Sequence, residues 1–438
     1  MGGEKLKAVS LFCSSGIGDL GLRANNIETV AACELLPERM RLFLHNYPEA
    51  KDFCGDIREL KDDIIAYYRN TFDEPPFLVL ATPPCQGMSS NGMGTILNNL
   101  KKGIRPKLDP RNKLIIPAVE IIKALQPEWV IFENVPNMVN TVIEDHGEMI
   151  NIIDYIRREL SDVYVGSPVV ADVANYCVPQ HRNRLITILT KNAAGKRYFE
   201  SVRSFMPEPT HSEDPTMFTQ KWLTVRDAIS DLPPIRSRKG ENIDPQNPLH
   251  KVPLLDDVKM FWVTNTPEGQ TAMNNQCVNP DCLYQGNTLH GAKHNAEGVN
   301  RANTDTPLYC ERCGALLPRP YTVDKETGKK RIMKGFVSAY KRMLWDRPAS
   351  TLTQNFQYAC SDNKLHPSQD RVLSLYEGLI IQTISQYPFS FVIDGKQVND
   401  GLIRDTIGES VPPLLIDKIA RHLIEISQPS RHSQSISA

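Results

Sequence analysis

"KAVSLFCSSGIGDLGLR", residues 7–23, passes from an apolar stretch through a glycine-rich turn into a helical pattern. Glycines at such a turn let a ligand approach the backbone at the N-terminus of the following helix. Helical patterns at 37–47 and 114–127 separate the further apolar runs of the region 1–190. Those runs are 28–34, 77–82, 128–135 and 184–190. Apolar strands separated by helices predict a parallel sheet covered on both faces, in a doubly wound, Rossmann-like α/β domain.

Length and composition predict two or three domains in a chain of 438 residues with 23% charged residues. We expect no membrane span, because no apolar run approaches about 18 residues. The first residues lack the apolar core of a signal peptide, so a cytoplasmic protein is expected. The net charge is −1, but residues 191–345 hold 22 Lys and Arg against 17 Asp and Glu. That imbalance is compatible with a face that binds phosphates.

The alternating pattern fails between about 191 and 345, where proline, glycine and polar residues dominate. The sequence predicts a separate, smaller and loop-rich domain there. Regular helical patterns return at 371–384 and 412–426, and residues 428–438 are expected to be a disordered tail.

Acidic residues follow two of the predicted strand positions. Glu34 ends the second apolar run, and Asp56 stands at the next edge, in "CGDIREL" (54–60). An acid at the end of the second strand commonly holds the ribose hydroxyls of an adenosine-type cofactor. A dinucleotide and S-adenosylmethionine are both compatible with this pattern, and a helix cap or turn is the simpler explanation of each acid alone.

Cys85 stands in "ATPPCQGMSS" (81–90), directly after an apolar run. Pro83 and Pro84 end the strand there, because proline cannot continue the ladder of hydrogen bonds. Most lone cysteines are small core residues. The polar, glycine-rich sequence after Cys85 is unsuited to a core, so a nucleophilic thiol at the edge of the pocket is the better interpretation.

A carboxylate and two guanidinium groups lie at further predicted strand ends. Glu133 closes the run in "IFENVPN" (131–137), and Arg182 and Arg184 lie in "QHRNRLITIL" (180–189). Buried groups of opposite charge normally pair with one another, so a structural salt bridge is the alternative to a catalytic role.

Together these motifs resemble those of the DNA cytosine-5 methyltransferases. They occur in the order "PPCQG", "ENV", "QHRNR", "DRPASTLT" (346–353) and "IGESVPP" (407–413), and the first glycine-rich motif and "HPSQDRVLSLYEGLIIQ" (366–382) fit the same pattern. The resemblance covers most of residues 6–427, with a loose match between about 191 and 345.

The resemblance implies a covalent mechanism on a cytosine that is flipped out of double-stranded DNA. Cys85 is expected to add to C6 as a thiolate, and Glu133 to bind N3 and the exocyclic amine. Arg184, with Arg182, is expected to hold the O2 side of the base or nearby phosphates.

The resemblance also implies S-adenosylmethionine as the methyl donor and S-adenosylhomocysteine as the product. The residues implied to line the cofactor are Phe12, Ile17, Glu34, Asp56, Ile57, Pro84, Leu114, Ser410 and Val411. Two positions depart from the family pattern: Asp19 replaces a glycine of the first motif, and Glu409 replaces an asparagine of the last. Both lie beside the expected cofactor.

Four cysteines in the middle region have the spacing of a zinc ribbon. Cys277 and Cys282 form a C-x4-C pair, and Cys310 and Cys313 form a C-x2-C pair further along the chain. Tetrahedral Zn²⁺ is bound by four thiolates from two such turns, so one structural zinc ion per chain is expected. In the family this variable region reads the DNA sequence.

The predicted organisation has a catalytic domain at 1–190 plus 405–427 and a target-recognition domain at 191–365, with the zinc ribbon at about 274–318. Residues 366–404 are expected to connect them. We expect a monomer in the prokaryotic cytoplasm or nucleoid. It would belong to a restriction-modification system, with a cognate restriction endonuclease, or act as a solitary or phage methylase.

Three alternatives remain open. A tRNA cytosine-5 methyltransferase would share the catalytic motifs, although the long middle region favours duplex DNA. A dinucleotide-dependent oxidoreductase would share the glycine-rich turn but not explain "PPCQ" with "ENV". A non-catalytic zinc-dependent DNA-binding regulator would not need Cys85.

Overall fold

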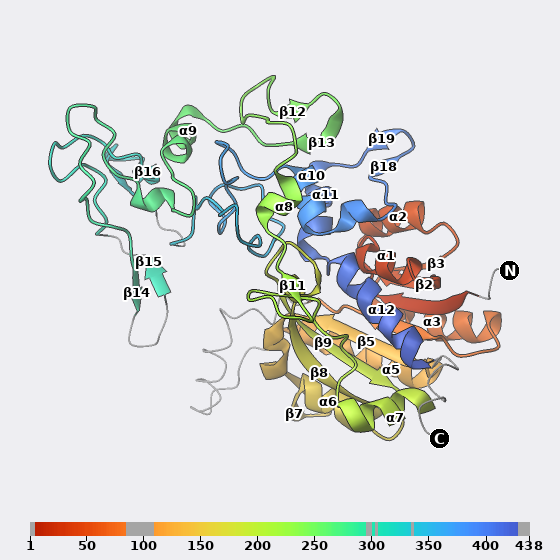
Figure 1. Cartoon of the computed structure of the whole chain (residues 1–438). Helices are drawn as coiled ribbons and strands as arrows, with labels where there is room; N and C mark the ends of the chain where they lie inside the picture. The colour runs from red at the N-terminus through yellow and green to blue at the C-terminus, as the bar shows by residue number, and fades with distance from the viewer. Residues whose placement is uncertain (1–4, 85–108, 295–299, 303–304, 334–336, 428–438) are drawn as a thin grey trace.

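A mixed seven-stranded sheet with the order β3-β2-β1-β4-β5-β9-β8 forms the centre of the protein (Figure 1). The computed structural model describes residues 5–84, 109–294, 300–302, 305–333 and 337–427. The strands are β1 (Leu6–Leu11), β2 (Ile27–Glu34), β3 (Lys51–Cys54), β4 (Leu78–Ala81), β5 (Trp129–Asn134), β8 (Val165–Asp172) and β9 (Asn183–Thr190).

The prediction of a parallel sheet is wrong at one edge. Strands β3, β2, β1, β4 and β5 run parallel, but β9 is antiparallel to both β5 and β8. Parallel neighbours need a crossover of about a dozen or more residues. Only residues 173–182 join β8 to β9, so the chain turns back on itself and β9 enters the sheet reversed.

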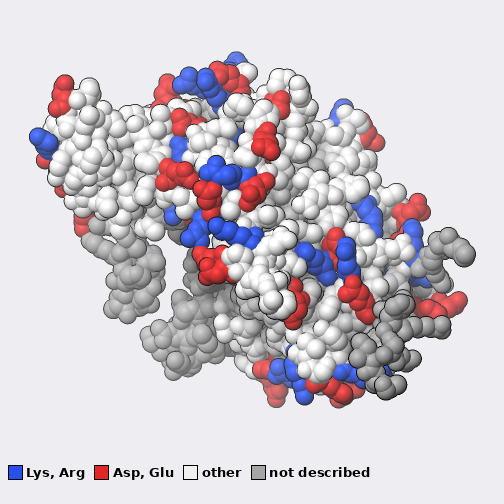
Figure 2. All heavy atoms as spheres, in the orientation of Figure 1, with Lys and Arg blue, Asp and Glu red and all other residues white. Residues whose placement is uncertain are grey.

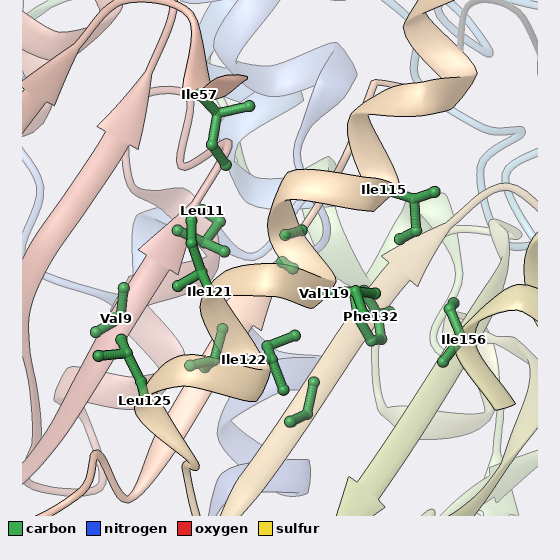
Figure 3. Close-up of a cluster of buried hydrophobic side chains, with 14 of the residues drawn as sticks. Val9, Leu11, Ile57, Ile115, Val119, Ile121, Ile122, Leu125, Phe132 and Ile156 are labelled. Atoms are coloured by element: carbon green, nitrogen blue, oxygen red, sulfur yellow. The ribbon is translucent and has the colours of Figure 1, made fainter. Parts of the chain in front are cut away.

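One face of the sheet is covered by α3 (Ile57–Thr71), α5 (Ile115–Leu125) and α6 (Ile152–Leu160). Figure 3 shows the apolar side chains of α5 among Val9 and Leu11 of β1 and Phe132 of β5. Because side chains alternate along a strand, the residues between these point to the opposite face.

The opposite face is covered by α1 (Ile17–Arg23), α7 (Ala193–Val202) and α12 (Pro413–Ser427). Ala8, Leu78 and Trp129 point to this side. Burial on both faces explains why the strands are apolar throughout. The last helix of the chain therefore packs onto the N-terminal sheet.

Three further helices pack together beside α1. They are α2 (Pro37–Asn46), α10 (Leu375–Ile381) and α11 (Asp400–Glu409). The helix expected at 371–384 is shorter than predicted. Ser374 and Glu377 form a capping box, in which each side chain accepts from the other's backbone, and this fixes the start of α10 at Leu375.

The middle of the chain forms short elements around a second apolar core that includes Trp262, Met273 and Leu365. Helix α9 (Asp257–Thr264) packs in this core, whereas α8 (Val225–Ile229) packs against α10. Two-stranded ribbons complete the described chain: β6 (Val142–Asp145) with β7 (Glu148–Asn151), β10 (His211–Ser212) with β11 (Gln220–Lys221), β12 (Ile243–Asp244) with β13 (Asn247–Lys251), β14 (Ala292–His294) with β15 (Asn300–Ala302), β16 (Tyr321–Val323) with β17 (Lys330–Ile332), and β18 (Val392–Ile393) with β19 (Lys396–Gln397).

The segment between Asn275 and Pro318 begins and ends at the same point beside this core, and its Leu308 packs in the core. The side-chain amide of Asn275 donates to the carbonyl of Pro318 at 2.7 Å. Arg319 Nε donates to the carbonyl of Asn275 at 2.8 Å, and its Nη1 donates to the carbonyls of Thr288 and Pro307. A single buried guanidinium thus binds the first residue of the segment and two points in its interior.

Figure 2 shows acidic and basic side chains mixed over the face in view. Among the described residues, no helix combines the length and the apolarity needed to cross a bilayer. The predicted tail at 428–438 lies outside the described residues.

Candidate functional site

A cavity of about 870 Å³ opens at the carboxyl ends of β1, β2, β4 and β5. Glu34 closes β2, Phe12 follows β1, Pro84 follows β4 and Glu133 lies near the end of β5. This is where ligands bind in open α/β sheets, and the volume falls in the range of small-molecule sites.

The turn after β1 forms one wall of the cavity. Phe12, Ser14 and Gly16 all have positive φ, and Gly16 at φ 83° precedes the first residue of α1. A Cβ on Gly16 would lie 2.5 Å from the ring of Tyr47 and 2.7 Å from that of Phe43. Only glycine fits both the conformation and the space, so Gly16 lets the turn pack against Phe43 and Tyr47 while Phe12, Ser14 and Ile17 border the cavity.

Glu34 is held rigidly at this wall. One carboxylate oxygen accepts the backbone N–H of Ser14 at 3.0 Å, and the other accepts that of Leu36 at 3.0 Å. Asp56 caps α3 and pairs with Arg58, whose hydrogen bond lowers the pKa of Asp56. The cavity thus offers a fixed carboxylate next to the apolar side chain of Ile57, which suits a nucleoside.

Asp19 lies beneath the cavity and is almost fully buried. Its carboxylate accepts the hydroxyl of Ser10 at 3.1 Å and that of Thr29 at 2.7 Å. Burial raises the pKa of Asp19 to about 6, against the lowering effect of these hydroxyls. The position that departs from the family glycine therefore holds a carboxyl group whose charged form is disfavoured by burial.

All nine residues predicted to line the cofactor border this one cavity. They are Phe12, Ile17, Glu34, Asp56, Ile57, Pro84, Leu114, Ser410 and Val411. They come from both ends of the sequence, because Ser410 and Val411, which lie between α11 and α12, border the same cavity as the residues that follow β1. Their contact with a cofactor stays a prediction.

Glu133 and Arg184 form a salt bridge on the same cavity. Glu133 Oε1 lies 2.8 Å from Arg184 Nε, and the two side chains are 8% and 12% exposed. Asn134, the next residue, donates its side-chain amide to the carbonyl of Pro83 at 2.9 Å. This bond fixes the proline pair that precedes Cys85 against the strand that carries Glu133. Cys85 itself lies outside the described residues.

Arg182 also borders the cavity, but its guanidinium is buried and bound to the main chain. Nη1 donates to the carbonyl of Leu352 at 2.7 Å, and Nη2 donates to that of Gly408 at 3.0 Å. Arg182 therefore joins the "DRPASTLT" and "IGESVPP" segments to β9. The sequence suggested a role beside Arg184 but gave no sign of these carbonyl partners.

Sequence reasoning missed Arg39 and Gln354, which border the cavity with Glu409. Arg39 Nη1 lies 2.6 Å from Glu409 Oε2, and the Gln354 amide donates to Glu409 Oε1. The unusual Glu409 was the one visible signal, since an acid at a cavity wall needs a partner.

The four cysteines of the middle region converge. Their sulfur atoms all lie within 4.8 Å of one another, with Cys277 and Cys313 at 3.7 Å and Cys282 and Cys310 at 3.9 Å. Zn–S bonds of about 2.3 Å in a tetrahedron place sulfurs about 3.8 Å apart, so this donor set fits zinc. His290, which lies between the two pairs in sequence, instead bonds Thr306.

Comparisons with known proteins agree with this geometry. The model of the C-5 cytosine-specific DNA methylase family matches residues 6–425. Type II methyltransferase M1.HgaI of Avibacterium volantium is 26% identical, over 96% of this chain and 98% of the relative. Type II methyltransferase M.AgeI of Thalassovita gelatinovora is 24% identical, over 94% and 97%.

Two solved structures share the fold. One is a protein encoded within an E. coli prophage, with TM-score 0.57 and 18% identity over 96% of this chain and 99% of that one. The other is a DNMT2 mutant of Spodoptera frugiperda, with TM-score 0.51 and 12% identity over 96% and 100%. At these identities the likeness extends to the fold alone.

Proposed function

The chain belongs to the C-5 cytosine-specific DNA methylase family, and we propose that Cys85, Glu133 and Arg184 carry its reaction at the edge of the cavity. The reaction of a DNA cytosine-5 methyltransferase is methyl transfer from S-adenosylmethionine to C5 of cytosine. The proposal rests on one observation: the Glu133–Arg184 pair and Pro84, one residue before Cys85, border the same cavity as Glu34.

The chemistry needs a nucleophile because C5 of cytosine is itself a weak one. The thiolate of Cys85 forms a bond to C6, and the electron pair of the C5–C6 double bond becomes available at C5. Glu133 gives a proton to N3 and accepts a hydrogen bond from the exocyclic amine, which stabilises the negative charge that develops on the ring. Arg184 fixes the Glu133 carboxylate and faces the O2 side of the base.

S-adenosylmethionine, when bound, supplies the electrophilic methyl group. After the methyl group has reached C5, the protein still has to release the methylated base. The C5 proton leaves to water, the electrons of the C5–H bond re-form the C5–C6 double bond, and the C6–S bond breaks to return the thiolate of Cys85. The target cytosine is extruded from the duplex, because its ring carbons are inaccessible in the stack.

Arg182 acts as a positioning residue in this proposal. Its carbonyl bonds hold the segments that contain Leu352 and Gly408 against β9, on which Arg184 stands. We assign the nine cavity residues named above to S-adenosylmethionine, with Glu34 on the ribose hydroxyls.

Residues 191–365 are proposed to recognise double-stranded DNA, with Cys277, Cys282, Cys310 and Cys313 holding one structural Zn²⁺. The support is the spacing of the four sulfurs. The two relatives named above are type II methyltransferases, and the match covers almost their full length. We therefore place the enzyme in a restriction-modification system with a cognate endonuclease.

The test uses duplex DNA that carries 5-fluorocytosine, in the presence of S-adenosylmethionine. Fluorine cannot leave as a proton does, so the complex should remain covalent, with the protein attached through Cys85. Cys85→Ser should abolish trapping, and Cys360→Ser, at an exposed cysteine, should not. A companion assay follows labelled S-adenosylmethionine into DNA or tRNA. Label in tRNA alone would select the tRNA methyltransferase, and tight DNA binding without transfer would select a regulator.

A further inference from the structure

A salt bridge on the cavity wall has no part in the chemistry described so far. Arg39, in the first turn of α2, pairs with Glu409 at the end of α11 at 2.6 Å. Gln354 binds the second carboxylate oxygen of Glu409. The Arg39 and Glu409 side chains are 16% and 26% exposed, so the pair is partly desolvated and still reached from the cavity.

The other charged groups on this wall have partners that explain them. Glu34 accepts two backbone N–H groups, Asp19 accepts two hydroxyls, and Glu133 binds Arg184. The remaining charged side chains on the wall pair with a near neighbour in sequence or bind carbonyls: Asp56 with Arg58, Arg111 with Asp109, and Arg182. The Arg39–Glu409 pair instead joins segments from opposite ends of the sequence.

The position of the pair follows from the sheet order. Glu34 is the last residue of β2 and Glu133 the last but one of β5, three strand spacings or about 14 Å away. A methyl donor whose nucleoside is held by Glu34, and whose methyl group is directed toward Glu133, occupies that span. Among the described charged groups that border the cavity, the Arg39–Glu409 pair, directly before Ser410, is the one whose partners leave it to meet the amino-acid end of the donor.

We propose that Arg39 and Glu409 form the subsite for the zwitterionic amino-acid end of S-adenosylmethionine. This inference rests on the proposed function. Arg39 takes the carboxylate of the ligand and Glu409 takes its ammonium group, while Gln354 keeps the Glu409 carboxylate in place. A zwitterion brings one charge of each sign, so it replaces the internal pair without leaving a buried charge uncompensated.

The experiment is calorimetric titration of the whole protein with ligands that differ at this end. S-adenosylhomocysteine carries both charges, decarboxylated S-adenosylmethionine lacks the carboxylate, and 5′-methylthioadenosine lacks the entire amino acid. Arg39→Met and Glu409→Gln remove the charges with little change in size. Arg41→Met is the control, because Arg41 lies on the same helix in an exposed pair with Asp394.

Both variants should bind S-adenosylhomocysteine about tenfold or more weakly, and 5′-methylthioadenosine within twofold of wild type. Arg39→Met should strengthen binding of decarboxylated S-adenosylmethionine, because this ligand brings no carboxylate to replace the partner of Arg39, whereas Glu409→Gln should weaken it. Equal losses for all three ligands, or no loss for S-adenosylhomocysteine in folded variants, would show that the pair merely supports the wall. A wild-type protein that binds none of these ligands would instead refute the proposed function.

Discussion

Replacing Asp19 by asparagine is expected to stabilise the ligand-free protein at neutral pH. The carboxyl group loses its proton near pH 3.8 in the unfolded chain, but burial raises the pKa of Asp19 to about 6 in the folded protein. Between these values the folded state holds more protons, so its stability falls as the pH rises from about 4 to 6 and stays reduced above that. Asparagine carries no such charge.

The size of the expected stability difference follows from the interval between the two pKa values of Asp19. Each pKa unit is worth about 1.4 kcal/mol, so the step from 3.8 to about 6 corresponds to roughly 3 kcal/mol above pH 7. The asparagine amide can still accept the Thr29 hydroxyl and donate to that of Ser10, which keeps both hydrogen bonds. We expect Asp19→Asn to exceed wild type by up to about 3 kcal/mol at pH 8, and the gain to vanish toward pH 4.

Urea unfolding of both proteins at several pH values between 4 and 8 measures this difference. Other titrating groups cancel, because they are common to both chains. Asp63→Asn, at an exposed position of α3, is the control and should change the free energy of unfolding by no more than about 0.5 kcal/mol. A difference between Asp19→Asn and wild type that stays constant with pH, or a loss at pH 8, would mean that burial does not disfavour the charged form of Asp19.

Three further changes test the architecture. Gly21→Ala should lower the melting temperature and reduce the free energy of unfolding by about 1–3 kcal/mol. The added Cβ would lie 2.5 Å from the Pro413 carbonyl and force α1 away from α12. An unchanged melting temperature would contradict this packing. Glu377→Gln should cost about 3–5 kcal/mol in urea unfolding, since it leaves the fully buried Arg371 unpaired, and a near-neutral result would refute that pairing. Chelation of zinc should lower the melting temperature and DNA binding but spare S-adenosylhomocysteine binding. Elemental analysis of metal-replete protein should find about one zinc per chain, and finding none would rule the metal site out.

The sequence predicted strands where burial is complete and missed them where it is not. The runs that became β1, β2, β4, β5 and β9 are apolar because helices cover both faces. β8 contains Gly166, Ser167 and Pro168 and is partly exposed, and β3 is short with a single buried side chain, so neither carries a strong pattern. The reversed direction of β9 depends on the short connection to β8, which composition does not reveal.

The candidate site could be predicted where a site residue lies in the last two positions of a strand. Glu34 and Glu133 needed only the rule that ligands bind at the carboxyl ends of strands. Arg39 carried no signal, because its partner Glu409 lies near the other end of the sequence and meets it only through the packing of α2 and α11. Nothing in the sequence around Arg182 indicates that its guanidinium ends on two carbonyls, because both carbonyls belong to segments far along the chain.

The meeting of Asn275 with Pro318 and Arg319 has a consequence for engineering the chain. Because the two ends of the segment already touch, a short turn can replace it without opening a long loop. We expect a variant shortened in this way to lose the four cysteines and the contribution of Leu308 to the neighbouring core, and to keep the seven-stranded sheet.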